Sequence, residues 1–458
     1  MTTRGNRAGR QAVVLGGSMA GLLAARVLAD AFPDVTIVDR DELAGVTAPR
    51  RGVPQGPHAH ALLARGQQVL EDLFPGLTAE FAAADMPLLD MGEMHWYLEG
   101  QRLCNAHTGL IAVSNSRPVL ESIVRARVAA LPGVTLATKH DVIGLVTTAG
   151  RDRVTGVTVR SQAAGSAERV LRADLVVDAL GRGSHMPVWL EELGYPRPAE
   201  DRVKIGLAYT TCEYLLPDRP LENDLSIISL ATPVSRYGAF FGRVGGDRHQ
   251  LSLTSMLADP PSTDAEGVLA CAKSLPVGRI YDAIRDVKPD TGPALIRFPH
   301  SVRRRYERLT SFPGGLLCVG DGVCSFNPVY GQGMTVAALE ALVLRRHLRG
   351  GRQDWQPPEA GPFFRDISEV IDAPWAIAAG GDLAWPGVEG ERTPQTEEMN
   401  AYMGQVMAAM MADGGITEAF MRVAGLIDPP GTLMDPGIRD RVLRASQPAA
   451  AQEADSHA

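Results

Sequence analysis

The stretch AVVLGGSMAGLLAARVL, residues 12–28, decides the fold. Its first four residues are an apolar, strand-like run, its middle is rich in glycine, and residues 22–28 have the composition of a buried helix. A second β-branched run, residues 35–38, ends at Asp39, about 20 residues after the turn. Strand, turn, helix, strand and terminal acid together form the context of a dinucleotide-binding fingerprint. The alternative, a βαβ unit whose turn is glycine-rich by coincidence, is disfavoured because all five features agree.

Each position of this turn has an expected task. Gly16 allows the tight turn, Gly21 lets helix and strand pack closely, and Asp39 accepts hydrogen bonds from a ribose. The middle glycine of the fingerprint, which lets a pyrophosphate approach the backbone, is replaced by Ser18. Serine is the next smallest choice, and its hydroxyl can itself bind a phosphate.

A second turn of the same kind lies near the other end of the chain, in residues 320–334, GDGVCSFNPVYGQGM. It follows an apolar run, residues 315–319, and leads into a helical pattern, residues 335–348. A glycine-rich turn between a strand and a helix aims backbone N–H groups at an anion. Two such turns, far apart in the sequence, indicate one large ligand held at two places.

Composition sets the limits of the function. The 458 residues suffice for two or three domains, and 45% hydrophobic with 21% charged residues is typical of a globular enzyme. A net charge of −8 disfavours nucleic-acid binding, and no apolar run is long enough to span a bilayer. The five cysteines form no CxxC pair, so neither a metal site nor a disulfide framework is expected, and a reducing cytoplasm fits best. Arg4, Arg7 and Arg10 are not followed by a signal-peptide cleavage site, and residues 446–458 are expected to be a disordered tail.

Residues 50–63 are loop-like at first, and a helix is predicted to start near His58. His58 and His60 are two residues apart and cannot share one helix face, so a metal pair is disfavoured. The loop is expected to run toward a bound cofactor. Arg117 precedes Pro118 at the start of a helix over residues 119–130, where it either contacts phosphate or ribityl oxygens or is a solvated arginine.

Residues 203–256 alternate in the manner of an antiparallel sheet, and residues 372–458 are helical and rich in methionine. Aromatic residues of the sheet either fill a core or line an apolar substrate cavity. The candidates for substrate contact are Tyr209, Tyr237, Phe241 and, from the helical segment, Trp375. Methionine at helical spacing is more often core filling than a binding feature.

The turn at residues 16–21, Asp39, Arg117, the strand end at residues 178–184 and the segment 320–334 follow the order seen in one family. The chain resembles single-component FAD-dependent monooxygenases of the para-hydroxybenzoate hydroxylase type over roughly residues 10–350. The runs RGVPQGPHAH, residues 51–60, and FNPVYGQGM, residues 326–334, are closer still to bacterial flavin epoxidases of polyether biosynthesis and related tailoring oxygenases.

This resemblance implies an α/β fold: a discontinuous, Rossmann-like FAD-binding domain, an antiparallel-sheet substrate domain and a C-terminal helical segment. The FAD domain would comprise residues 1–78, 104–185 and 286–350, the substrate domain 79–103 and 186–285, and a helical cap 351–445. Asp321 would bond the ribityl hydroxyls, and Pro328, Gly331, Gln332 and Gly333 would face the flavin ring. The residues expected to bind FAD are Gly16, Gly17, Ser18, Met19, Ala20, Gly21, Asp39, Arg40, Arg51, Arg117, Gly320, Asp321, Pro328, Gly331, Gly333 and Met334.

The resemblance also implies the chemistry. A flavin C4a-hydroperoxide would pass one oxygen atom from O₂ to an apolar natural-product intermediate, free or bound to a carrier protein, by epoxidation or hydroxylation. Epoxidation needs no protein base, which fits a chain without a GxSxG or HExxH motif. The strand end that usually reads Asp-Gly is Leu180-Gly181, so NAD(P)H acts either directly or through a separate flavin reductase.

Three alternatives remain beside the monooxygenase. One is a flavin-dependent C=C reductase of the geranylgeranyl reductase type. A halogenase is disfavoured because its WxWxIP signature is absent; residues 374–377 do not reproduce it. A non-catalytic nucleotide-binding module would leave the second turn without a purpose.

Overall fold

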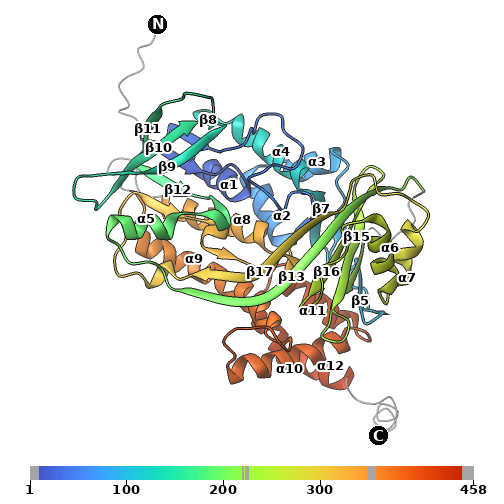
Figure 1. The fold of residues 1–458 in the computed structure, drawn as a ribbon. Helices are drawn as coiled ribbons and strands as arrows, with labels where there is room; N and C mark the ends of the chain where they lie inside the picture. Colours follow the sequence, from blue (N-terminus) through green and yellow to red (C-terminus); the bar gives the residue numbers. More distant parts are fainter. Residues whose placement is uncertain (1–9, 219–220, 222–225, 349–356, 446–458) are drawn as a thin grey trace, which may run out of the picture.

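The computed structural model describes residues 10–218, 221, 226–348 and 357–445. Arg4, Arg7 and the tail expected over residues 446–458 lie outside the described residues. Among the described residues, no helix is both long enough and apolar enough to cross a membrane. Figure 1 shows the two main bodies of the fold, a layered α/β region around α1 and α8 and a large curved sheet beside it.

The centre of the α/β region is a parallel sheet of five strands in the order β18-β12-β1-β2-β8. Strands β1, β12 and β18 are buried almost continuously, as expected for a parallel sheet covered on its faces, whereas the edge strand β8 is partly exposed. Helices α1 and α8 pack against each other beside it, and α4 packs against α1. The bounds are β1 Gln11–Leu15, β2 Asp34–Val38, β8 Val134–Ala137, β12 Leu175–Asp178, β18 Leu316–Cys318, α1 Met19–Leu28, α4 Arg117–Ala129 and α8 Gly333–Leu348.

Two small antiparallel sheets and several helices complete this region. One sheet has the order β11-β10-β9 and the other β3-β7-β4. The bounds are β9 His140–Thr147, β10 Val154–Ser161, β11 Glu168–Arg172, β3 Ala59–Leu62, β7 Ile111–Ser116, β4 Leu88–Asp90, α2 Ala64–Leu73, α3 Leu77–Ala83 and α5 Met186–Leu193. The helix predicted to start near His58 is wrong: residues 59–62 form β3 because they pair with β7, and α2 begins at Ala64.

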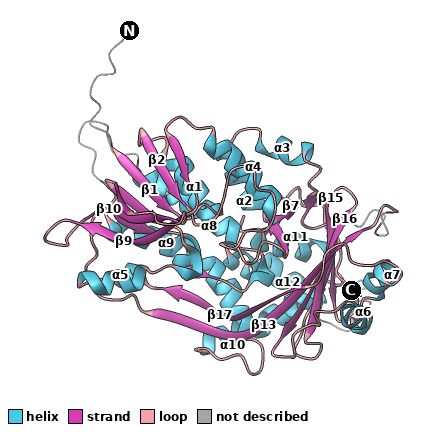
Figure 2. Ribbon diagram, turned by 45° about the horizontal axis from the view of Figure 1, so that its top comes forward, coloured by secondary structure: helices cyan, strands magenta, loops and turns pink. Residues whose placement is uncertain are grey.

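The second body is a mixed sheet of eight strands in the order β19-β17-β13-β16-β15-β14-β5-β6. Its outer face packs on α6 and α7, which Figure 2 shows on the far side of β15 and β16. Strand β17 joins this sheet, so the sheet draws strands from both sides of the domain boundary expected at residue 286. The bounds are β5 His95–Leu98, β6 Gln101–Arg102, β13 Glu200–Leu215, β14 Ser226–Leu230, β15 Tyr237–Gly245, β16 Arg248–Met256, β17 Ala294–Arg304, β19 Cys324–Ser325, α6 Ala265–Ser274 and α7 Gly278–Ile284.

Residues 357–445 form a group of helices that we call the helical cap. Its methionines pack with residues of β7 and the loops around it, so the methionine-rich helices fill a core as expected. The bounds are α9 Ala360–Trp375, a π-helical turn Ala376–Gly380, α10 Pro394–Ala409, α11 Gly414–Ala424 and α12 Pro436–Ala445.

Candidate functional site

The first glycine-rich turn joins β1 to α1 with very little space around it. The backbone of Gly16 has φ of +101°, and a Cβ there would lie 2.5 Å from the carbonyl oxygen of Ala179. A Cβ on Gly21 would lie 1.8 Å from the carbonyl oxygen of Gly16. Both glycines are therefore required by geometry, which agrees with the tasks assigned to them from the sequence.

Asp39 ends β2 beside this turn, and 8% of its surface is exposed. Its carboxylate accepts hydrogen bonds from the backbone N–H groups of Gly17, at 2.6 Å, and Asp41, at 2.8 Å. Burial raises the pKa of Asp39, although these hydrogen bonds and the charge of Arg50 oppose the rise. The acid is thus held at the carboxyl end of the strand, where a dinucleotide's ribose is bound in Rossmann folds.

A buried cluster of charges lies next to the same turn, built around Glu121 of α4. Glu121 accepts a hydrogen bond from Ser18 Oγ at 3.0 Å and forms ion pairs with Arg50, Arg117 and Arg125. Burial opposes its ionisation, but Arg117 and Arg50 lower its pKa below the usual value. The carboxylate is therefore charged and fixes three arginines around the turn.

Arg117 is 6% exposed and donates to Ser18 Oγ at 3.0 Å. It is not the solvated arginine of the alternative interpretation, because its guanidinium lies at the first turn between α1 and α4. The other arginines near this turn differ in burial. Arg40 and Arg51 are exposed, whereas Arg50, which was not selected, is buried and bonds the carbonyl oxygen of Gly17.

The second glycine-rich turn contacts the first one directly. Gly320 has φ of +68° after β18, and a Cβ there would lie 2.8 Å from the Cβ of Ala20 in α1. Asp321 follows it, and burial raises the pKa of its carboxyl while Arg182 and Arg117 oppose the rise. Segments from the two ends of the chain therefore meet, as the sequence predicted for a ligand held at two places.

Glu340 of α8 supports the second turn and was not foreseen. It is fully buried, and its Oε2 accepts a hydrogen bond from the backbone N–H of Gly320. Burial raises its pKa to about 8. A signal was present in the sequence, because Glu340 is a lone acid in the apolar helical run of residues 335–344.

The last part of the second turn, residues 328–334, leads into α8 and carries the groups expected to face a flavin ring. Pro328–Tyr330 form a single 3₁₀ turn, and Gly331 follows with φ of +69°. The Oε1 atom of Gln332 is buried without a hydrogen-bond partner among the described residues. A Cβ on Gly333, the first residue of α8, would meet nothing within 4 Å. Met334, also selected from the sequence, is buried in the core.

These features fit the pyrimidine edge of a flavin. The ring offers polar atoms that need partners, a helix N-terminus stabilises negative charge on its reduced form, and a flat group needs a backbone without side chains. An unpartnered buried amide oxygen, the open side of Gly333 and the start of α8 provide all three. Met19 and Ala20 lie at the start of α1, and Ala20 is the residue that faces Gly320 of the second turn.

The strand end at Leu180 is organised by an acid that points inward. Asp178 accepts a hydrogen bond from the backbone N–H of Leu180 at 2.9 Å and another from Ser184 Oγ. Burial raises the pKa of Asp178. Its carboxylate therefore stabilises the turn and cannot serve in place of the acid that the resemblance leads one to expect at position 180. Arg182 donates to Ser325 Oγ at 3.1 Å and covers the ring of Phe298.

The two histidines of the loop before β3 lie in different environments. Nδ1 of His58 lies 2.8 Å from Thr211 Oγ1 of β13, and its ring packs edge-on against Tyr209. His60 donates from Nδ1 to the carbonyl oxygen of His58 at 2.8 Å. Burial lowers the pKa of His58 to about 4, and burial together with Arg117 lowers that of His60 to about 3. Both rings are therefore neutral at pH 7.

The register of the large sheet aligns one row of side chains across its inner face. Trp96 pairs with Ile228, Ile228 with Phe240, Phe240 with Ser252, and Ser252 with Thr211. Ile228 and Phe240 are half-buried and belong to none of the packed cores. The row ends in polar groups, because the hydroxyls of Thr211 and Ser252 lie 2.8 Å apart and Thr211 contacts His58. We call these five residues the inner row.

The predicted substrate residues divide between the two faces of this sheet. Tyr209 and Trp375 belong to a cluster on the inner side, between the sheet and the cap. Tyr237 and Phe241 pack instead with the core under α6 and α7, and Phe241 is completely buried. Strand residues alternate between faces, and these two share the outer one. Ile228, Phe240 and Trp96, on the inner face, were not selected from the sequence.

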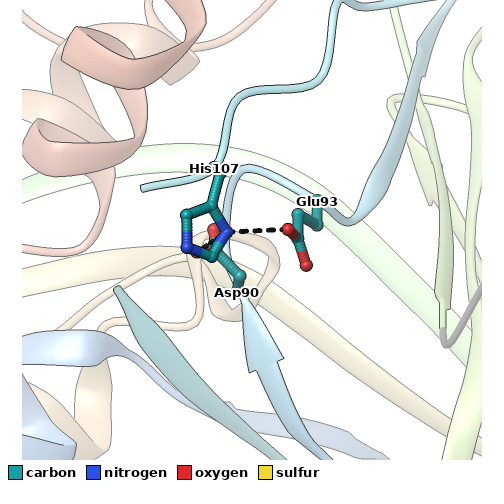
Figure 3. A group of neighbouring side chains, drawn as sticks. All are labelled: Asp90, Glu93 and His107. Atoms are coloured by element: carbon teal, nitrogen blue, oxygen red, sulfur yellow. Dashed lines mark hydrogen bonds and ion pairs between the residues drawn. The ribbon is translucent and has the colours of Figure 1, made fainter. Parts of the chain in front are cut away.

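Asp90, Glu93 and His107 form another group whose side chains could offer atoms to a cation (Figure 3). Asp90 is already saturated, because it accepts hydrogen bonds from Gly92 N, Thr108 N, Thr108 Oγ1 and Gly109 N. His107 is 79% exposed and lies 2.8 Å from Glu93. The group stabilises a loop, and its geometry gives no independent sign of a bound ion.

Known proteins resemble this chain in sequence and in fold. A family model described as FAD dependent oxidoreductase matches residues 11–188. Protein Rv3254 of Mycobacterium tuberculosis is 36% identical over 441 residues, which cover 93% of this chain and 92% of that protein. The flavin-dependent brominase Bmp2 has a TM-score of 0.63 and 15% identity, covering 98% of this chain and 99% of its own. The p-nitrophenol 4-monooxygenase PnpA from Pseudomonas putida has a TM-score of 0.61 and 14% identity, covering 92% and 100%.

The chain therefore has the fold of flavin-dependent enzymes such as Bmp2 and PnpA. The chain belongs to the same family as Protein Rv3254, and its residues 11–188 match the model of the FAD dependent oxidoreductases.

Proposed function

We propose that the chain is an FAD-dependent monooxygenase that transfers one oxygen atom from O₂ to an apolar substrate, by epoxidation of an alkene or by hydroxylation. The observation that supports this most strongly is the contact between the two glycine-rich turns, at Gly320 and Ala20. One extended cofactor can then lie along both. The strand β1, helix α1 and acid Asp39 match its ADP half, and the start of α8 matches its ring.

Different residues would bind different parts of the cofactor. Gly16–Gly21 and Asp39 would hold the adenosine and its ribose, and Ser18 with Arg117 would hold the phosphates. Asp321 would bind the ribityl hydroxyls, and Gln332 with Gly333 would face the ring. Bound flavin supplies the reaction with O₂; the chain supplies orientation, a site without bulk water and partners for the ring.

The inner row is proposed to bind the substrate. Its apolar end, Trp96–Ile228–Phe240, suits a hydrocarbon chain or ring, and its polar end suits one hydroxyl or carbonyl group. His58 is neutral and hydrogen-bonded at that end, so it orients a polar group without adding a charge. The resemblance of residues 51–60 and 326–334 to flavin epoxidases supports a natural-product intermediate, free or bound to a carrier protein.

The reductant is proposed to be NAD(P)H, delivered through a separate flavin reductase. The resemblance leads one to expect an acid at position 180, but this residue is leucine. The carboxylate of Asp178 cannot take its place, because it already accepts a hydrogen bond from the backbone N–H of Leu180. Enzyme with FAD and NADPH alone should consume O₂ slowly, and addition of a flavin reductase should restore the rate. Rapid reduction by NADPH alone would show that the nicotinamide binds directly.

The function is tested by turnover under ¹⁸O₂ with a polyene alcohol, for which geranylgeraniol is a suitable probe. Flavin reduced by light under anaerobic conditions removes the dependence on the reductant. One ¹⁸O atom in the product is expected, with the same product unlabelled in ¹⁶O₂. A hydrogenated product without label would favour the C=C reductase instead.

A further inference from the structure

The helical cap places one buried acid against the turn that precedes α8. Asp382 follows the π-helical turn Ala376–Gly380 and is 1% exposed. Its Oδ1 atom accepts hydrogen bonds from Asn327 Nδ2 at 2.8 Å and from the hydroxyl of Tyr330 at 3.3 Å. Its Oδ2 atom is buried and has no hydrogen-bond partner among the described residues.

The local backbone lets the cap approach this turn closely. A Cβ on Gly381 would lie 2.6 Å from the hydroxyl of Tyr330. Asn400 of α10 donates to the carbonyl oxygen of Gly380 at 2.9 Å and ties the π-helical turn to the rest of the cap. π-helical turns often occur at functional sites, and the buried acid lies two residues after the end of this one.

Asn327 transmits the contact to the backbone of the turn. Its Nδ2 donates to Asp382, and its Oδ1 accepts from the backbone N–H of Val329 at 3.0 Å. The turn then passes through Gly331, in the left-handed conformation, to the first N–H groups of α8. Burial raises the pKa of Asp382 to about 7, while Asn327 and Tyr330 oppose the rise. Keeping this acid buried has a cost in stability, and a packing role alone would be met by an apolar residue.

We infer that Asp382 is a positioning residue for the flavin: through Asn327 and Tyr330 it fixes the turn that presents the start of α8, so the flavin site is complete only with the C-terminal cap docked. This inference rests on the proposed function, which assigns the start of α8 to the flavin ring. Asp382 itself acts through the turn, because its hydrogen bonds go to Asn327 and Tyr330.

The test compares Asp382→Ala, Asp382→Asn and Tyr330→Phe in the full-length holoprotein, with Asp428→Asn as control. Asp428 forms an ion pair with Arg422 within the cap and lies outside this contact. FAD affinity is measured by fluorescence titration, and the midpoint potential of the bound flavin by dye equilibration. Asp382→Ala should weaken FAD binding about tenfold or more and shift the potential, since it removes the acceptor of two buried donors. Asp382→Asn keeps the acceptor and should restore affinity to within about threefold.

The remaining outcomes separate the two claims. Tyr330→Phe removes one donor without cutting back the acid, so a smaller change in potential is expected even if Asp382→Ala folds poorly. Unchanged affinity and potential in Asp382→Ala and Tyr330→Phe would overturn the role of Asp382. Wild-type protein that binds no FAD would instead contradict the proposed function.

Discussion

The hydroxyl oxygen of Ser18 lies 3.0 Å from Nη2 of Arg117, although the two residues are 99 positions apart in the sequence. The same hydroxyl donates to Glu121. Ser18 replaces the middle glycine of the dinucleotide fingerprint. Its hydroxyl therefore departs from the motif and also connects the start of α1 to Arg117 and Glu121 of α4. The guanidinium of Arg117 is thereby held at the turn, where a cofactor's phosphates are expected to bind.

Ser18→Ala should weaken FAD binding about tenfold, because a hydroxyl bonded to two charged groups is lost and Arg117 keeps only its ion pair with Glu121. Ser18→Gly restores the usual fingerprint but loses the same hydrogen bonds, so a similar loss is expected. Both are measured by titration of apoprotein with FAD. Tighter binding by Ser18→Gly than by the wild type would show that serine is only tolerated at this position.

Gly333→Ala should weaken FAD binding while leaving the apoprotein as stable as the wild type. The space beside this residue holds no protein atom within 4 Å, so an added methyl group meets only the proposed flavin ring. Gly404→Ala is the matched control, because Gly404 lies in α10 with equally open surroundings. That substitution should stabilise the helix by about 0.5–1 kcal/mol and leave FAD affinity unchanged. Equal FAD affinity in Gly333→Ala and the wild type would place the ring elsewhere.

Ile228→Trp should raise KM for an elongated apolar substrate about tenfold and leave FAD content unchanged, because the larger ring fills the centre of the inner row. Steady-state rates with the substrate identified under ¹⁸O₂ give the measurement. Val170→Trp is a suitable control, since Val170 is 48% exposed on β11, in a different sheet. A KM that Ile228→Trp does not change would remove the inner row from the substrate site.

Glu340→Gln should raise thermal stability in alkaline solution and have little effect in acid. The folded-state pKa of Glu340, about 8, lies above the ordinary value of 4.5. The wild type therefore loses stability as the pH rises from about 4.5 to 8, by up to about 5 kcal/mol, whereas glutamine has no proton to lose. Melting temperatures from pH 5 to pH 9 test this, with the exposed Glu389→Gln as control. A difference between Glu340→Gln and wild type that does not grow with pH would contradict an acid held neutral by burial.

Much of the fold could be predicted because the local signals agree with the tertiary structure. The apolar strand β1, the glycines at 16 and 21 and the acid at 39 each have a local requirement that the sequence displays. The helix at α8 and four strands of the large sheet, β13 to β16, were recognised for the same reason, their periodicity. Residues 59–62 were not, since β3 forms only by pairing with β7, and nothing within four residues signals a distant partner.

Residues of the candidate site were harder to predict where the direction of a side chain decides what it contacts. Arg50 and Arg51 are adjacent and chemically equal, and only the folded loop decides which one turns inward. Phe241 and Phe240 are likewise adjacent, and the strand's alternation sends one to the outer core and the other to the inner row. Asp382 is separated from Asn327 by 55 positions, so their hydrogen bond has no local signal in the sequence.

The most direct test of the account is whether the purified chain binds FAD with both of its glycine-rich turns. Wild-type protein should be yellow, or become yellow on reconstitution, and denaturation should release FAD in an amount approaching one per chain. Asp321→Ala should lose most of this flavin, because the ribityl hydroxyls would lose the Asp321 carboxylate that is proposed to bind them. A colourless protein that cannot be reconstituted with FAD would contradict the central claim, and full flavin content in Asp321→Ala would contradict the part assigned to the second turn.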